Sequence, residues 1–196
     1  MRLDNWKKEI CTIPNLLSLF RLILIPVYVF IYLNADSSMD YFVAATILAV
    51  SCLTDLIDGK IARHFGMVSN VGKILDPLAD KATQFTLIIC LSVKYPVLIG
   101  LVILFVIKEG FQLIAGAVNL RKGIMLKGAQ LSGKICTTVL FISLIVMVMI
   151  PNLPYPYVVV LTLLDLLFMG ISFADYCITY AKRDHKFQPI DADNNI

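Results

Sequence analysis

Six long apolar segments run through this chain of 196 residues, and they limit its possible folds more than any other feature. A helix that crosses a hydrocarbon core of about 30 Å needs roughly 20 apolar residues, because each residue adds about 1.5 Å. Six segments have this length, near residues 14–33, 41–62, 74–93, 96–118, 131–150 and 156–180. The composition, 59% hydrophobic and only 16% charged, is too apolar for a soluble domain. We therefore predict an all-α integral membrane protein, a bundle of six transmembrane helices.

The lysines and arginines predict how these helices are oriented. They gather in the N-terminal segment, the second and fourth connections and the C-terminal tail, whereas the opposite connections hold only Lys94. By the positive-inside rule, both the N and C termini are then cytoplasmic. We expect a multi-pass protein of the cell membrane with three parts: an interfacial amphipathic segment over 1–13, a six-helix domain over 14–182 and a cytoplasmic tail over 183–196.

Four aspartates stand between the second and third predicted helices, inside otherwise apolar surroundings. Asp55 and Asp58 are three residues apart, and Asp76 and Asp80 are four apart, so each pair shares one helix face. The predicted orientation brings both pairs to the cytoplasmic side of the membrane. Four carboxylates at one place need cations, and ligands that are all oxygen favour Mg²⁺ or Mn²⁺ over zinc. The sequence therefore predicts a divalent-metal site.

The spacing of this stretch resembles the signature of the CDP-alcohol phosphatidyltransferase family, D-x₂-D-G-x₂-A-R-x₈-G-x₃-D-x₃-D. The fixed positions are filled by Asp55, Asp58, Gly59, Ala62, Arg63, Gly72, Asp76 and Asp80. The resemblance covers the whole chain, because the family core has six membrane helices with the motif on helices 2 and 3. The opening IPNLLSLFR at residues 13–21 further resembles bacterial phosphatidylglycerophosphate synthases and the related cardiolipin synthases.

The resemblance implies an enzyme of phospholipid biosynthesis. It would transfer the phosphatidyl group from CDP-diacylglycerol to an alcohol and release CMP. Glycerol 3-phosphate is the leading candidate for this alcohol, and the product would then be phosphatidylglycerophosphate. Two Mg²⁺ or Mn²⁺ ions would neutralise the pyrophosphate of the donor. The implied metal ligands are Asp55, Asp58, Asp76 and Asp80. Asp80 is also the implied general base, which would deprotonate the acceptor hydroxyl.

The remaining motif residues are expected to bind the CDP-lipid together with Asp55 and Asp58. Gly59 and Gly72 lack a side chain, so a nucleotide or phosphate can approach the backbone closely. Ala62 lies one turn beyond Asp58, and its small side chain leaves room for the ligand there. The planar guanidinium of Arg63 suits a phosphate or the cytidine.

A phosphorylated acceptor needs a basic pocket of its own. The candidates near the predicted cytoplasmic face are Arg21, Lys108, Arg121 and Lys134. Lys134 is favoured, because it heads the fifth predicted helix in a G-K-hydrophobic segment similar to that of phosphatidylglycerophosphate synthases. For Arg121, contact with anionic lipid headgroups explains the charge equally well.

Other interpretations stay open. Phosphatidylglycerol as the acceptor would make the chain a cardiolipin synthase. From other classes, a membrane prenyltransferase also uses aspartates and Mg²⁺ on a diphosphate, and a cation transporter would also explain membrane carboxylates. We expect membrane lipids and a second copy of the chain as partners, the latter implied by the family, and no nucleic acid. Asp165, deeper in the sixth predicted helix, has no assigned role.

Overall fold

The computed structural model describes residues 13–64, 72–121, 124–126, 130–150, 152–182 and 187–189. Side chains are described for residues 15–51, 53–54, 75–119, 121, 130–150 and 152–181. The predicted interfacial segment, apart from its last residue, lies outside these ranges. The described chain forms two compact units. Unit 1 runs to Leu91 and includes residues 147–150, and unit 2 comprises residues 92–146 and those from Asn152 onward.

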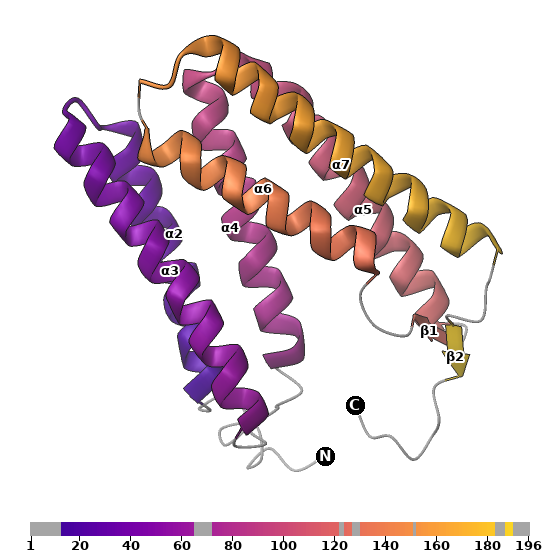
Figure 1. Ribbon diagram of the computed structural model, residues 1–196. Helices are drawn as coiled ribbons and strands as arrows, with labels where there is room; N and C mark the ends of the chain where they lie inside the picture. Colours follow the sequence, from indigo (N-terminus) through magenta and orange to yellow (C-terminus); the bar gives the residue numbers. More distant parts are fainter. Residues whose placement is uncertain are drawn as a thin grey trace. The chain divides into compact units, whose positions relative to one another are not determined.

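Unit 1 contains α2 (Ile13–Leu33), α3 (Ser38–His64) and most of α4 (Gly72–Lys94). The helices α2 and α3 lie side by side (Figure 1). Their contact includes Tyr32, which stacks on Tyr28 at 5.6 Å between ring centroids and meets Tyr41 of α3 edge-on at 5.7 Å. Buried apolar side chains of α4, among them Leu87, complete the interior of this unit.

A reciprocal cap starts α3 directly after the turn from α2. The backbone N–H of Ser37 donates to Oδ2 of Asp40 at 2.9 Å, and the backbone N–H of Asp40 donates to the hydroxyl of Ser37 at 3.3 Å. Both residues thereby satisfy N–H groups that the first helical turn leaves without a partner. The cap explains why the helix begins at Ser38, three residues before the predicted span.

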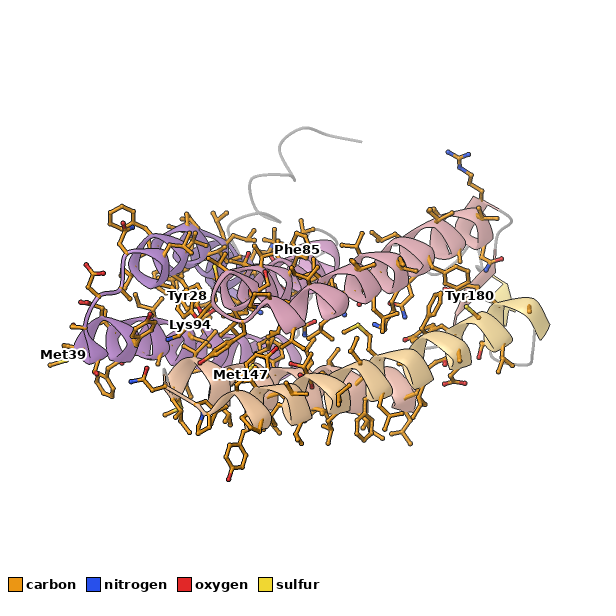
Figure 2. The ribbon with its side chains drawn as sticks, turned by 90° about the horizontal axis from the view of Figure 1, so that it is seen from above. Tyr28, Met39, Phe85, Lys94, Met147 and Tyr180 are labelled. Atoms are coloured by element: carbon orange, nitrogen blue, oxygen red, sulfur yellow. The ribbon has the colours of Figure 1, made fainter. Side chains whose placement is uncertain are left out.

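Unit 2 contains three long helices and two short strands. Its elements are η1 (Pro96–Leu98), α5 (Ile99–Arg121), β1 (Ile124–Leu126), most of α6 (Leu131–Met149), α7 (Tyr155–Lys182) and β2 (Phe187–Pro189). The ring of Phe111 in α5 meets Phe173 and Tyr180 of α7 edge-on, at 5.5 and 5.9 Å. Tyr180 lies between these two helices in Figure 2.

Two short strands accompany the helices and leave the predicted all-α class unchanged. The strands β1 and β2 pair antiparallel, with Met125 opposite Gln188. The connection after α5 and the predicted tail are therefore joined by backbone hydrogen bonds. Each strand has only three residues, too few for an alternating pattern to mark it in the sequence.

Four helices in the described part of the chain are long and apolar enough to cross a membrane. They cover Asn15–Leu33, Pro96–Asn119, Leu131–Met149 and Tyr155–Ala181. These correspond to the first, fourth, fifth and sixth predicted spans. The second and third predicted spans lie in the helices α3 and α4, and within the described residues α3 contributes the shorter apolar helix Ser38–Ser51. The chain is a multi-pass membrane protein, and the count of six spans stays a prediction.

The buried face of α7 carries several polar residues, whereas its exposed face is apolar. Leu163 and Leu167 are 58% and 61% exposed, as expected for side chains that meet lipid. The buried positions follow a spacing of three and four residues, and four of them are polar: Thr162, Asp165, Ser172 and Thr179. Lipid is as apolar as leucine, so polar and small residues turn inward at contacts between membrane helices.

Candidate metal and active site

Helix α4 presents two motif aspartates on one face. Asp76 and Asp80 stand four residues apart and are both half-buried, with the fully buried Ala79 beside them. A spacing of four residues places them one above the other on a helix. The two carboxylates predicted to share a face are therefore on one described helix and partly accessible.

Helix α2 provides a hydrogen-bond donor for each of these carboxylates. The hydroxyl of Ser18 donates to Oδ1 of Asp76. Nη1 of Arg21 donates to Oδ1 of Asp80 at 2.5 Å, which makes a salt bridge. From the first contact to the second, α2 advances three residues and α4 advances four, about one turn each. The two helices therefore run in the same direction past this site.

The two members of the salt bridge differ strongly in exposure. The side chain of Arg21 is 2% exposed and that of Asp80 is 40% exposed. A buried guanidinium stays charged and needs its anionic partner. The accessible side of the pair is consequently the carboxylate, where a substrate or a cation can reach it.

The other half of the motif lies at the same end of unit 1. Figure 1 shows the last turns of α3, the start of α4 and the start of α2 at one end of this unit. Asp55, Asp58, Gly59, Ala62 and Arg63 belong to those last turns of α3, and Gly72 is the first residue of α4. Their side chains lie outside the described ones, so their roles as ligands stay predictions.

The donor set that is described fits a hard divalent cation. Among the described side chains no three acidic, histidine or cysteine residues form a cluster, since only Asp76 and Asp80 of the four motif aspartates are included. Both offer carboxylate oxygen, the ligand type that Mg²⁺ and Mn²⁺ prefer. Each also has one oxygen fixed by a donor on a neighbouring helix, as is usual for metal-binding carboxylates.

The four basic candidates for the acceptor pocket have different surroundings. Arg21 belongs to unit 1 and is held by Asp80, whereas the other three belong to unit 2. Lys108 is buried, and its Nζ donates to Oε1 of Glu109 at 2.7 Å. Arg121 ends α5 and Lys134 lies in the first turn of α6, both exposed. A shared pocket for these residues stays a prediction.

The sequence interpretation missed the part that α2 plays. Ser18 was not among the candidate site residues, and Arg21 was assigned to the acceptor and not to Asp80. One signal could have found both: Asn15, Ser18 and Arg21 are polar residues at three-residue intervals in an apolar helix, and all three are buried. Such a stripe on a membrane helix indicates a polar partner on another helix.

A family model described as CDP-alcohol phosphatidyltransferase matches residues 11–173. The chain belongs to the CDP-alcohol phosphatidyltransferase family. Members of this family generally use divalent metals, CDP-diacylglycerol and an alcohol acceptor. The family that the motif indicated is therefore confirmed.

The relatives of the chain are named for two different activities, phosphatidylglycerophosphate synthesis and cardiolipin synthesis. The chain is 29% identical to a CDP-diacylglycerol–glycerol-3-phosphate 3-phosphatidyltransferase of Aquifex aeolicus over 171 residues, which cover 85% of the chain and 94% of that protein. It is 36% identical to a probable phosphatidylglycerophosphate synthase of Mycobacterium tuberculosis over 88 residues, or 44% of the chain. It is 42% identical over 89 residues, or 45% of the chain, to a Schizosaccharomyces pombe fusion of cardiolipin synthase (CMP-forming) and a mitochondrial hydrolase. The match spans 42% of the mycobacterial protein and 14% of the fusion protein.

Proposed function

We propose that this chain transfers the phosphatidyl group of CDP-diacylglycerol to glycerol 3-phosphate, forming phosphatidylglycerophosphate and releasing CMP. The observation that carries the proposal is the pair of half-buried carboxylates, Asp76 and Asp80, held by Ser18 and Arg21 at the motif end of unit 1. The choice of acceptor is supported by the Aquifex relative, which is named for this activity and is matched along 94% of its length.

The chemistry follows from what Asp80 can do. Its carboxylate, 40% exposed, accepts the proton of the acceptor hydroxyl as that oxygen attacks the β-phosphorus of the donor. The new bond joins the acceptor oxygen to phosphorus, and the bond from the β-phosphorus to the bridging oxygen breaks, so that CMP leaves with that oxygen. Two divalent ions, when bound by Asp55, Asp58, Asp76 and Asp80, supply the positive charge that the pyrophosphate needs.

The motif residues next to the aspartates would hold the donor. Gly59, Ala62, Arg63 and Gly72 would lie along the nucleotide and the phosphates.

The membrane arrangement belongs to the same proposal. We propose six spans with both termini in the cytoplasm, an active site that faces the cytoplasm, the cell membrane as location, and a homodimer. The distribution of lysine and arginine supports this orientation. The basic residues Lys108, Arg121 and Lys134 of unit 2 would provide the pocket for the phosphate of the acceptor.

Phosphatidylglycerol is the second candidate acceptor and would make the product cardiolipin. It is favoured by the name of the Schizosaccharomyces relative and by that of a Streptomyces coelicolor protein called cardiolipin synthase (CMP-forming), 28% identical over 66% of the chain.

CMP release decides between these functions. The full chain is purified, reconstituted in vesicles with CDP-diacylglycerol, and assayed with and without Mg²⁺ or Mn²⁺ against a panel of acceptors. Metal-dependent release with glycerol 3-phosphate supports the main proposal, and release with phosphatidylglycerol alone supports the second. No CMP release with any acceptor would contradict both functions and favour a prenyltransferase or a cation transporter.

A further inference from the structure

We infer that helix α2 is a positioning element of the metal site, in which Ser18 orients the carboxylate of Asp76 and Arg21 orients that of Asp80. The inference rests on the proposed function only for the identity of the site, since the contacts themselves lie on described residues of unit 1. It assigns a role to two side chains outside the aspartate motif.

Burial separates these contacts from chance surface pairs. The side chains of Asn15, Ser18 and Arg21 are 3%, 0% and 2% exposed, although they are polar and belong to a helix long and apolar enough to span a membrane. Burying such groups is favourable only when they are hydrogen-bonded, and an intramembrane charge is tolerated only beside a partner. The partners on the face that α2 turns inward include the two motif aspartates.

The geometry suits orientation of the carboxylates. An aspartate on a helix has two side-chain torsions, and a metal site needs both fixed. Each aspartate receives its donor from a different residue of the same helix, at Oδ1 in both cases. The two contacts are about one helical turn apart on α2 and also on α4. A single register of α2 against α4 therefore orients both aspartates.

The contrast in exposure favours positioning over acceptor binding for Arg21. Its side chain is 2% exposed, so an incoming phosphate would have to displace buried contacts to reach it. Moving the guanidinium away from Asp80 would also break the salt bridge of a buried positive charge, which is unfavourable. Arg21 therefore stays with Asp80 and acts through that carboxylate.

The test measures metal affinity directly. Full-length Ser18→Ala, Ser18→Thr, Arg21→Gln and Arg21→Lys proteins are titrated with Mn²⁺ in detergent, with free Mn²⁺ followed by electron paramagnetic resonance and thermal stability measured in parallel. We expect Ser18→Ala and Arg21→Gln to weaken Mn²⁺ binding about 10- to 100-fold, the range for residues that orient metal ligands. Ser18→Thr keeps the hydroxyl and Arg21→Lys keeps the charge, so both recover part of the affinity.

Two matched variants control for disturbance of unit 1 and for loss of charge. Thr83→Ala removes another buried hydroxyl, one that bonds the carbonyl of Ala79 within α4 at 2.8 Å. Lys94→Gln removes a positive charge from the last residue of α4. Both should keep the wild-type Mn²⁺ affinity.

The same proteins are assayed for turnover with each substrate varied. The inference predicts a lower kcat and a higher metal requirement for Arg21→Lys, with the KM for the acceptor within about twofold of the wild type. A higher acceptor KM with unchanged Mn²⁺ affinity would instead make Arg21 an acceptor ligand and overturn the inference. Unchanged Mn²⁺ affinity in both Ser18→Ala and Arg21→Gln, or a wild type that binds no Mn²⁺, would overturn it too. If the wild type binds Mn²⁺ but releases no CMP with any acceptor, the proposed function fails while the metal titrations still decide this inference.

Discussion

Arg21 of α2 and Asp80 of α4 form a salt bridge of 2.5 Å although 59 residues separate them in the chain. The arginine is buried and the carboxylate is partly exposed, so α2 contacts the last aspartate of the family motif on its buried side. The carboxylate that we propose as general base is thus held in place and reachable at once.

Replacing Asp80 by asparagine should stop turnover and spare binding of the donor. Asparagine keeps an oxygen that can accept the hydrogen bond from Arg21 but cannot take up a proton, and loss of a general base costs about 10²- to 10⁴-fold in kcat. Steady-state CMP release and equilibrium binding of a CDP-lipid measure the two properties. Equal loss of both would contradict the role of Asp80 as base.

Asp40 should make the stability of the protein depend on acid pH. The backbone N–H of Ser37, with further bonds from the Ser37 hydroxyl and the Asp36 N–H, holds the pKa of Asp40 below its usual range. A lowered folded-state pKa adds stability above the unfolded pKa of about 3.9, and this stability is lost as pH falls through the folded pKa. Asp40→Asn should therefore melt below the wild type at pH 7, with the two curves converging in acid. A difference in Tm that stays constant from pH 7 to pH 2 would refute this origin.

Asp165 should be dispensable for folding. The side chain is 1% exposed, and neither carboxylate oxygen has a hydrogen-bond partner among the described residues, although Ser143 of α6 lies near. A lone carboxylate inside a membrane helix is costly, so Asp165→Asn should keep or raise the Tm and leave kcat within about threefold.

Ser132→Ala provides the contrast to Asp165→Asn. The hydroxyl of Ser132 donates to Asp175 of α7 at 2.5 Å, and its loss should cost about 1 kcal/mol of unfolding free energy. A large loss of activity in Asp165→Asn would show instead that the buried carboxylate has a functional ligand.

Gly133 should resist enlargement, because α6 passes close to α7 at this residue. An added Cβ would lie 3.0 Å from the hydroxyl oxygen and 3.3 Å from Cε2 of Tyr176. We expect Gly133→Ala to lower the unfolding free energy by about 1–3 kcal/mol. Gly116→Ala is the matched control, since the nearest atom there is the Tyr180 hydroxyl oxygen at 4.0 Å, and it should be neutral or slightly stabilising. Equal Tm values for the two variants would argue against this close approach.

The helices and the motif could be predicted from the sequence because their signals are local. Runs of about 20 apolar residues indicate the long helices, and the spacing of Asp76 and Asp80 on a helix follows from its 3.6-residue turn. Helix ends were less exact: the predicted second span began at residue 41, whereas the Ser37–Asp40 cap begins α3 at Ser38.

Contacts between distant segments could not be predicted in the same way. Nothing in the residues around Ser18 names Asp76 as its partner, because the register of α2 against α4 depends on how the helices pack in three dimensions. The pairing of β1 with β2 rests on backbone hydrogen bonds between segments about 60 residues apart. An acceptor pocket likewise depends on the placement of Lys108, Arg121 and Lys134 in space, which their sequence positions do not determine.

The most direct test of the central claim is the Mn²⁺ dependence of CMP release from CDP-diacylglycerol and glycerol 3-phosphate by the wild type and by Asp76→Asn. Asp76→Asn removes one charged oxygen ligand and keeps an acceptor for Ser18. We predict that the wild type releases CMP only when the metal is present, and that Asp76→Asn needs at least about 10-fold more Mn²⁺ for half-maximal rate. Identical Mn²⁺ curves for the two proteins, or CMP release that does not require metal, would contradict a divalent-metal site built on the motif aspartates.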